Sequence, residues 1–172
     1  TVHLAFPVAT AEPLVDALAA ALTPRTRLAV LDHVAPETAL VMPLAAMATA
    51  CRARGVAVLA DGAHAPGALA LDIPALGVDY YTANLHKWAH APRATGILWA
   101  HPDHHRDLHH PVVSWGWDKG FPEEFENQAT HDPSNALAAP AGIALFHEWG
   151  WASVRDYMHR LAWDTGRLLT DR

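Results

Sequence analysis

The sequence predicts a three-layer α/β/α fold built on a mainly parallel sheet. Two apolar helical segments alternate with two short apolar segments of strand length in the first part of the chain, and this order is typical of α/β proteins. The strand segments are continuous apolar runs, the pattern of strands buried on both faces of a parallel sheet that helices cover. The chain has 172 residues, 51% of them hydrophobic, which is enough for one domain with a substantial core.

The first four elements carry clear boundary signals. Pro13 lies in the first turn of its helix, where a missing N–H costs nothing. Gly55 follows the second helix as a C-cap, and the second strand leads directly into Asp61. In chain order, we predict a helix over 12–23, a strand over 27–33, a helix over 43–54 and a strand over 56–60.

The second half continues with strands and helices around a long loop. Residues 111–135 are polar, aromatic and interrupted by Pro and Gly, which is typical of a functional loop. Within it, Trp115 and Trp117 either line the mouth of a substrate site or pack in a core or interface. The other predicted elements are strands over 79–83 and 96–100, a short helix over 103–110, and helices over 138–149 and 151–169.

Composition excludes several classes of protein. The net charge is -6 and no stripe of Lys and Arg is present, so we expect no nucleic-acid partner. No apolar run is long enough to span a membrane, and we expect a cytoplasmic protein. The single cysteine, Cys51, excludes an internal disulfide, and it is expected to be a small core residue.

Asp61 is the first candidate functional residue. It lies at the carboxyl end of a predicted parallel strand, where ligands bind in sheets of this kind. The small residues Gly62 and Ala63 and then His64 follow it. The alternative, a carboxylate that only caps a helix or forms a turn, is about equally consistent with the sequence.

Lys87 is the second candidate. Most lysines are solvated surface charges, but this one lies between His86 and Trp88 after a predicted strand. Burial there would favour the uncharged amine, which is a usable nucleophile.

Taken together, these motifs resemble a known family. Asp-Gly-Ala-His at 61–64, His-Lys-Trp at 86–88 and the Ala-Pro before a Gly-hydrophobic strand at 96–100 occur in the order found in class V aminotransferases. Within that family, they are most similar to isopenicillin N epimerase-like proteins. The resemblance extends from about His33 to Met158. It implies the large domain of the aspartate aminotransferase-like fold, which binds pyridoxal phosphate (PLP).

The resemblance also implies a role for each site residue. Lys87 matches the lysine that forms a Schiff base with PLP, and Asp61 matches the carboxylate that pairs with the pyridinium nitrogen. His64 matches the position that contacts the phenolic oxygen, and His86 lies near the phosphate. Thr130 matches a threonine that reaches the phosphate of the neighbouring subunit's cofactor, which implies a homodimer with shared active sites.

The chain departs from the family pattern in three respects. Family members commonly have glycine where this chain has Ala94 and Ala129. The family's earlier phosphate-binding turn has no counterpart here, nor has the carboxyl-terminal domain with its arginine for the substrate carboxylate. We therefore expect residues 1–172 to be a partial PLP-binding domain, apparently a fragment, in which 151–172 form a helix leading toward a small domain.

A histidine cluster offers an alternative site. His101, His105 and His109 would share one face if the helix over 103–110 were long enough, and such a face can bind zinc. No carboxylate or cysteine completes a typical ligand set, so we expect a polar surface helix and no metal.

The expected activity is PLP-dependent chemistry at the α-carbon of an amino acid or a small peptide, most similar to the epimerisation of isopenicillin N-like substrates. Two alternatives remain open. One is a lyase or cysteine desulfurase of the same family, and the other is a truncated, catalytically silent relative.

Overall fold

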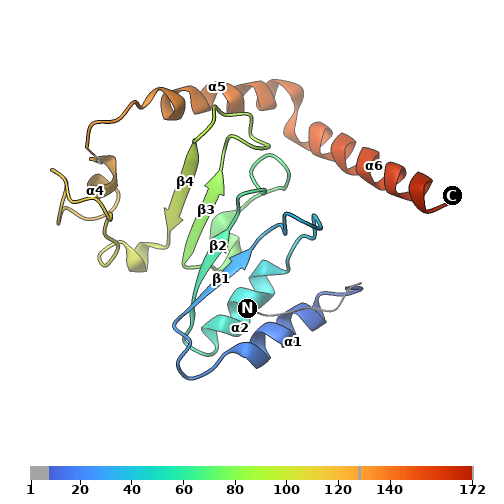
Figure 1. Ribbon diagram of the computed structural model, residues 1–172, viewed down its shortest axis with the longest axis horizontal. Coiled ribbons are helices and arrows are strands. Elements are labelled where there is room, and N and C mark those ends of the chain that lie inside the picture. The colour runs from blue at the N-terminus through green and yellow to red at the C-terminus, as the bar shows by residue number, and fades with distance from the viewer. Residues whose placement is uncertain (1–7, 128, 172) are drawn as a thin grey trace.

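The computed structural model describes residues 8–127 and 129–171. The ends of the expected domain, residues 1–7 and Arg172, lie outside the described part. Helices and strands alternate through the first half of the chain, and two long helices end it (Figure 1). In order, the elements are α1 (Glu12–Ala21), β1 (Leu28–Asp32), α2 (Leu44–Arg52), β2 (Ala57–Asp61), α3 (Ile73–Leu76), β3 (Tyr80–Asn84), β4 (Gly96–Ala100), a 3-10 turn (Pro102–His104), α4 (Glu123–Glu126), α5 (Ser134–Trp149) and α6 (Trp151–Thr170).

The four strands form one mainly parallel sheet in the order β1-β2-β3-β4. β1, β2 and β3 run parallel, whereas β4 runs antiparallel to β3. Asp32 pairs with Asp61 across β1 and β2, and Asp61 pairs with Thr82 on β3. The carboxyl ends of the three parallel strands therefore meet at one edge of the sheet, as the predicted α/β arrangement requires.

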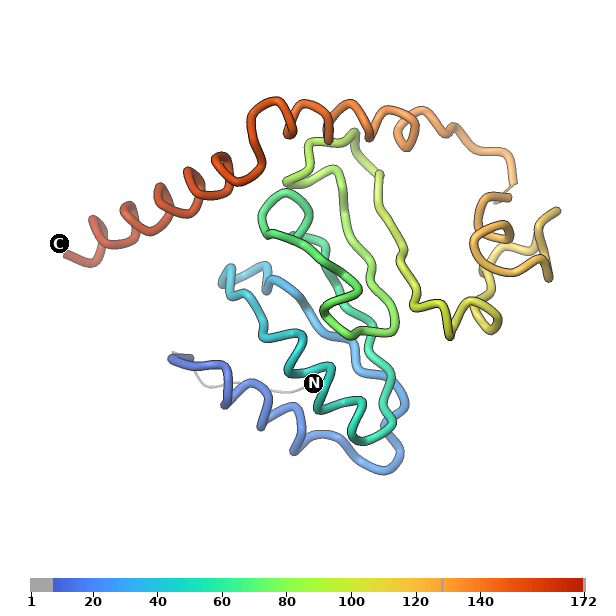
Figure 2. The backbone as a smooth tube through the Cα atoms, turned by 180° about the vertical axis from the view of Figure 1, so that it is seen from behind, coloured from blue at the N-terminus to red at the C-terminus, as the bar shows by residue number. Residues whose placement is uncertain are grey.

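The core lies between the sheet and helices α1 and α2, which lie side by side on one of its faces (Figures 1 and 2). Cys51 is fully buried there, which confirms its prediction as a core residue. On β1 the side chains alternate, so that Leu28 and Val30 are 47% and 64% exposed. This differs from the burial on both faces that its apolar run predicts. The core cluster includes Leu18, Leu44, Met47, Cys51, Val58 and Tyr81.

The prediction of a helix over 103–110 is wrong. Only the 3-10 turn at residues 102–104 forms, because side-chain contacts take the chain off a helical path. His105 Nε2 hydrogen-bonds the carbonyl oxygen of Ala100 at 2.9 Å, and the backbone N–H of His110 donates to Glu124 at 2.8 Å. The three histidines of the predicted face therefore do not share a helix face.

Two further differences concern helix boundaries. The loop predicted over 111–135 contains the short helix α4. Helix α5 begins at Ser134, before the predicted 138, and continues through Pro140. Proline ordinarily ends or kinks a helix, and for this reason the sequence favours a later start. Helix α5 crosses the ends of β3 and β4, and α6 extends away from the sheet (Figures 1 and 2). Within the described residues, no helix is both long and apolar enough to cross a membrane.

Candidate active site

The candidate site lies where β2 and β3 end. Asp61 closes β2, and the turn after it carries His64. Asn84 closes β3, and the turn after it carries Lys87 and Trp88. Because these strands are parallel neighbours in the sheet, the two turns meet although 23 residues separate His64 from Lys87.

Three side chains form the centre of the site. Lys87 Nζ lies 3.1 Å from His64 Nε2. On the opposite edge of the same imidazole, the indole Nε1–H of Trp88 donates to Nδ1 at 3.4 Å. Lys87 and His64 are half-buried, and Trp88 is 44% exposed. The structure thus brings together Lys87 and His64, two of the residues that the sequence predicts for the site.

Asp61 has one oxygen engaged and one open. Its Oδ1 accepts a hydrogen bond from the backbone N–H of Ala63 at 2.9 Å, which is the turn-forming role given above as an alternative. Within the described residues, its Oδ2 makes no hydrogen bond. Since a carboxylate accepts several bonds, the turn-forming role leaves Asp61 able to bind a cationic ligand group as well.

A buried pair supports the backbone of this turn. Tyr81 Oη and His33 Nδ1 are 2.8 Å apart and share a hydrogen bond, and His33 N–H donates to the carbonyl of Asp61 at 2.8 Å. Burial raises the pKa of Tyr81, with the charge of Asp61 adding to the effect, and burial also lowers the pKa of His33. Both groups are therefore held neutral beneath the site.

Glycine is required above that pair. A Cβ at Gly62 would overlap the ring and hydroxyl of Tyr81. Similarly, a Cβ at Gly67 would overlap the backbone carbonyl of Trp88, so the turns after β2 and β3 are in backbone contact. Neither His33 nor Tyr81 is among the site residues that the sequence predicts. The signal that could have found them is their place beside the site: Tyr81 is a buried residue of β3, and His33 directly follows β1.

The other two predicted residues lie apart from this centre. His86 Nδ1 is 3.1 Å from the carbonyl oxygen of Thr95, so it faces the start of β4. Thr130 is exposed in the segment between α4 and α5. In the part of the chain that the structure describes, Thr130 makes no hydrogen bond to Lys87, His64 or Asp61, and its role across a dimer stays a prediction.

The histidines of the 101–109 segment have separate partners. His101 lies near Asp103 and His109 lies near Glu124, while His105 bonds the chain as described above. Among the described residues, no three His, Cys, Asp or Glu side chains converge in a way that could hold a metal ion.

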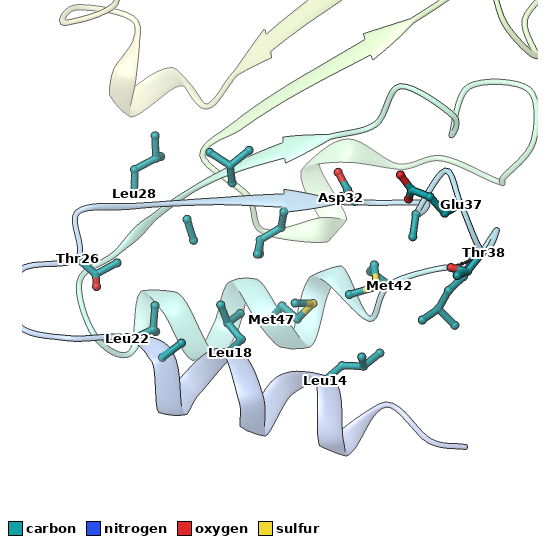
Figure 3. Close-up of a pocket in the computed structure, with 16 residues that line it drawn as sticks. Leu14, Leu18, Leu22, Thr26, Leu28, Asp32, Glu37, Thr38, Met42 and Met47 are labelled. Carbon is teal, nitrogen blue, oxygen red and sulfur yellow. Dashed lines mark hydrogen bonds between the residues drawn. The ribbon is translucent and has the colours of Figure 1, made fainter. Parts of the chain in front are cut away.

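A cavity of about 680 Å³ lies elsewhere, between α1, α2 and β1 (Figure 3). Leucine and methionine side chains dominate its wall, among them Leu14, Leu18 and Met47. Asp32 and Glu37 lie at its polar end. Neither Lys87 nor His64 lines it, so this cavity does not identify the candidate site.

Comparison with known proteins identifies the family. The family model for aminotransferase class-V matches residues 1–170, and the chain belongs to this family. Isopenicillin N epimerase of Amycolatopsis lactamdurans is 36% identical, a match that covers 91% of this chain and 43% of that protein. Putative L-cysteine desulfhydrase 1 of Oryza sativa subsp. japonica is 35% identical, over 99% of this chain and 38% of that protein. The chain therefore spans about two-fifths of the length of these relatives.

Solved structures of similar fold agree with the family match. The cystine C-S lyase C-DES, in complex with cysteine persulfide, is 34% identical, with a TM-score of 0.70 over 80% of this chain and 40% of that one. The Escherichia coli cysteine desulfurase CsdA reaches a TM-score of 0.80 at 21% identity, over 93% of this chain and 42% of that one, which supports the fold alone. These matches confirm the predicted α/β/α fold class.

The residues present fit the predicted cofactor, pyridoxal phosphate. The site offers an amine, an imidazole and a carboxylate at the carboxyl ends of adjacent strands. A variant of C-DES, 33% identical to this chain, is described with glycine covalently linked to its PLP cofactor. With the family match, this confirms PLP as the cofactor of the family to which the chain belongs.

Proposed function

We propose that Lys87 binds PLP covalently and that the protein removes the α-proton of an amino-acid substrate. The observation that carries this proposal is the contact between Lys87 Nζ and His64 Nε2 beside Asp61, at the carboxyl ends of β2 and β3. This is the part of an α/β sheet where ligands bind.

Each site residue has a role that follows from its chemistry. When bound, PLP supplies an electron sink for negative charge at the substrate α-carbon. Asp61, with one carboxylate oxygen open, would hold the cationic ring nitrogen of the cofactor, because an opposite charge favours the protonated form. His64 is a hydrogen-bonding partner for a cofactor oxygen. The free amine of Lys87 would accept the α-proton of the substrate.

The preferred reaction is epimerisation at the α-carbon, with the proton returned to the opposite face. Relatives named isopenicillin N epimerase support it. A second candidate is loss of sulfide from cysteine, which the relatives named L-cysteine desulfhydrase and the C-DES structure support. Both reactions begin with loss of the α-proton, so one arrangement of Lys87, His64 and Asp61 serves either.

We further propose a homodimer in which Thr130 completes the neighbouring subunit's site. Its exposure, in a segment outside its own subunit's cluster, is consistent with a contact across subunits. The substrate is then an amino acid or a small peptide bound between the two copies.

The test of cofactor attachment is spectroscopic. The full-length protein with added PLP is expected to show the visible absorbance band of covalently bound cofactor, and Lys87→Ala is expected to lose it. Lys119→Ala is the matched control, since the chain has only these two lysines and Lys119 pairs with Glu123 on the surface. An equal band in Lys87→Ala would overturn the assignment.

The two reactions are separated by their products in D₂O. Epimerisation gives inverted amino acid with deuterium at the α-carbon and no loss of side chain. Loss of sulfide from cysteine gives hydrogen sulfide, pyruvate and ammonia. If neither amino-acid exchange nor sulfide release occurs with a bound cofactor, the proposal of α-proton chemistry fails and the catalytically silent alternative holds.

A further inference from the structure

The position of Trp88 restricts where His64 can carry its proton. An indole N–H only donates hydrogen bonds, and Trp88 Nε1–H points at His64 Nδ1 at 3.4 Å. Nδ1 must therefore be the accepting nitrogen. A neutral imidazole with an accepting Nδ1 carries its hydrogen on Nε2, and Nε2 is the atom that faces Lys87 Nζ at 3.1 Å.

This tautomer constrains the lysine in turn. An Nε2–H group needs an acceptor, and only the uncharged amine of Lys87 has a lone pair to offer. An ammonium group has three donors and no acceptor, so it would require a bare Nε2. His64 would then carry its proton on Nδ1, and the indole N–H of Trp88 would lose its partner. The two bonds to His64 coexist only when Lys87 is a free amine.

We propose that Trp88 is a positioning residue that selects the His64 tautomer and thereby favours the free-amine form of Lys87. The proposal rests on the proposed function, in which this amine attacks the cofactor, because the free amine is the nucleophile. Among the described residues, the Trp88 indole hydrogen-bonds His64 and not Lys87, so it acts through His64.

The surroundings hold this arrangement in place. The close backbone approach of Gly67 to the Trp88 carbonyl fixes the two turns against each other, and Ala89 beside Trp88 is almost fully buried. The nearby Asp61 carboxylate is engaged by Ala63, and the His86 imidazole faces Thr95. Among the described residues, neither side chain hydrogen-bonds His64, whose Nδ1 is bonded by Trp88.

The tautomer can be observed without cofactor. In the full-length protein stripped of PLP and labelled with ¹⁵N-histidine, the ring nitrogens of His64 are assigned at about pH 8, where an ordinary histidine is neutral. The native protein is expected to show Nε2 protonated. Trp88→Phe keeps an aromatic ring without the N–H and is expected to shift the population toward protonated Nδ1. Trp163→Phe, on exposed α6, is the control that leaves the His64 signals unchanged. Unchanged His64 signals in Trp88→Phe overturn the proposal.

The effect on the lysine is measured by chemical labelling. Acetic anhydride reacts with free amines, and mass spectrometry compares Lys87 with Lys119 as an internal reference. Loss of one net hydrogen bond predicts that Trp88→Phe slows labelling of Lys87 by about two- to tenfold. In a His64→Gln background, the same change is expected to have no further effect. A slowing that persists in that background means that the indole acts on Lys87 directly, which overturns the route through His64. Both measurements are made without PLP, so their failure is distinguishable from failure of cofactor attachment in Lys87→Ala.

Discussion

Ala94 and Ala129, like Ala39, have backbone conformations that L-residues rarely adopt. The φ angles of Ala94 and Ala129 are 64° and 73°, in the left-handed region where a Cβ costs about 1–2 kcal/mol. These are the positions where the sequence departs from the glycines common in the family. The structure gives the physical reason for those glycines, which adopt positive φ without steric cost. Ala94 also precedes Thr95, whose carbonyl oxygen contacts His86.

The prediction at this scale is that Ala94→Gly stabilises the protein. Relief of the Cβ clash outweighs the added entropy of the unfolded chain, so the free energy of unfolding is expected to rise by about 0.5–1 kcal/mol. Ala138→Gly, at an exposed position inside α5, is the matched control and is expected to lower that free energy by about 1 kcal/mol. Urea denaturation measures both changes. A loss of stability in both variants would show that Ala94 is not strained.

Among the elements, α4 is tied to the preceding loop by a buried carboxylate. Glu124 is 2% exposed, and it accepts hydrogen bonds from His109 Nδ1 at 3.0 Å and from the backbone N–H of His110 at 2.8 Å. The ring of His109 stacks on Trp117 at 5.1 Å between centroids. Burial by itself would raise the pKa of Glu124, but these hydrogen bonds and the backbone N–H of Asp118 hold it below the ordinary value.

This arrangement predicts a response to acid. A carboxyl group with a depressed pKa in the folded state stabilises that state above its unfolded pKa of about 4.3. The contribution is lost as the pH falls through the lower folded value. The amide signal of His110 in NMR spectra is therefore expected to titrate with a midpoint below about 4.3, and Glu124→Gln is expected to abolish this transition. A midpoint at or above the ordinary glutamate value would contradict the inference.

Helices and strands could be predicted from the sequence where nearby residues set their boundaries. Proline at helix starts and apolar strand runs gave α1, α2 and the first two strands to within a few residues, and β4 at residues 96–100. It failed over 103–110, where contacts with Ala100 and Glu124 set the path of the chain. Glu124 is 14 residues from His110, and no local pattern shows such a contact.

At the scale of the whole molecule, the order of the strands in the sheet brings motifs that are separate in the sequence together at one site. The sequence placed Asp61 and Lys87 at strand ends, and the resemblance to a family supplied their roles. The contacts of Trp88 with His64, and of His33 with Tyr81, depend on which face each side chain takes and on the pairing of β2 with β3. These could not be predicted from spacing alone, because they join residues 24 and 48 positions apart.

We also propose, for the molecule as a whole, that residues 1–172 are part of a larger PLP-binding unit. The chain spans 38–43% of the length of the relatives described above. Several apolar side chains of the chain are exposed to solvent. Leu168 and Leu169 on α6 are 60% and 67% exposed, and Val30 on β1 is 64% exposed. On the proposal, these exposed side chains would be available for contacts with further protein.

We therefore expect residues 1–172 expressed alone to bind PLP more weakly than the full-length protein and to lack turnover. Each hydrogen bond missing from the cofactor phosphate weakens binding, and loss of two or more predicts a decrease in affinity of about tenfold or greater. Poor orientation of the substrate removes much of the rate, since positioning supplies about 7–11 kcal/mol in favourable cases. Fluorescence titration with PLP and α-deuterium exchange in D₂O compare the two proteins, with Lys87→Ala in each as the baseline. Equal affinity and equal exchange would show that the short chain is a complete catalytic unit.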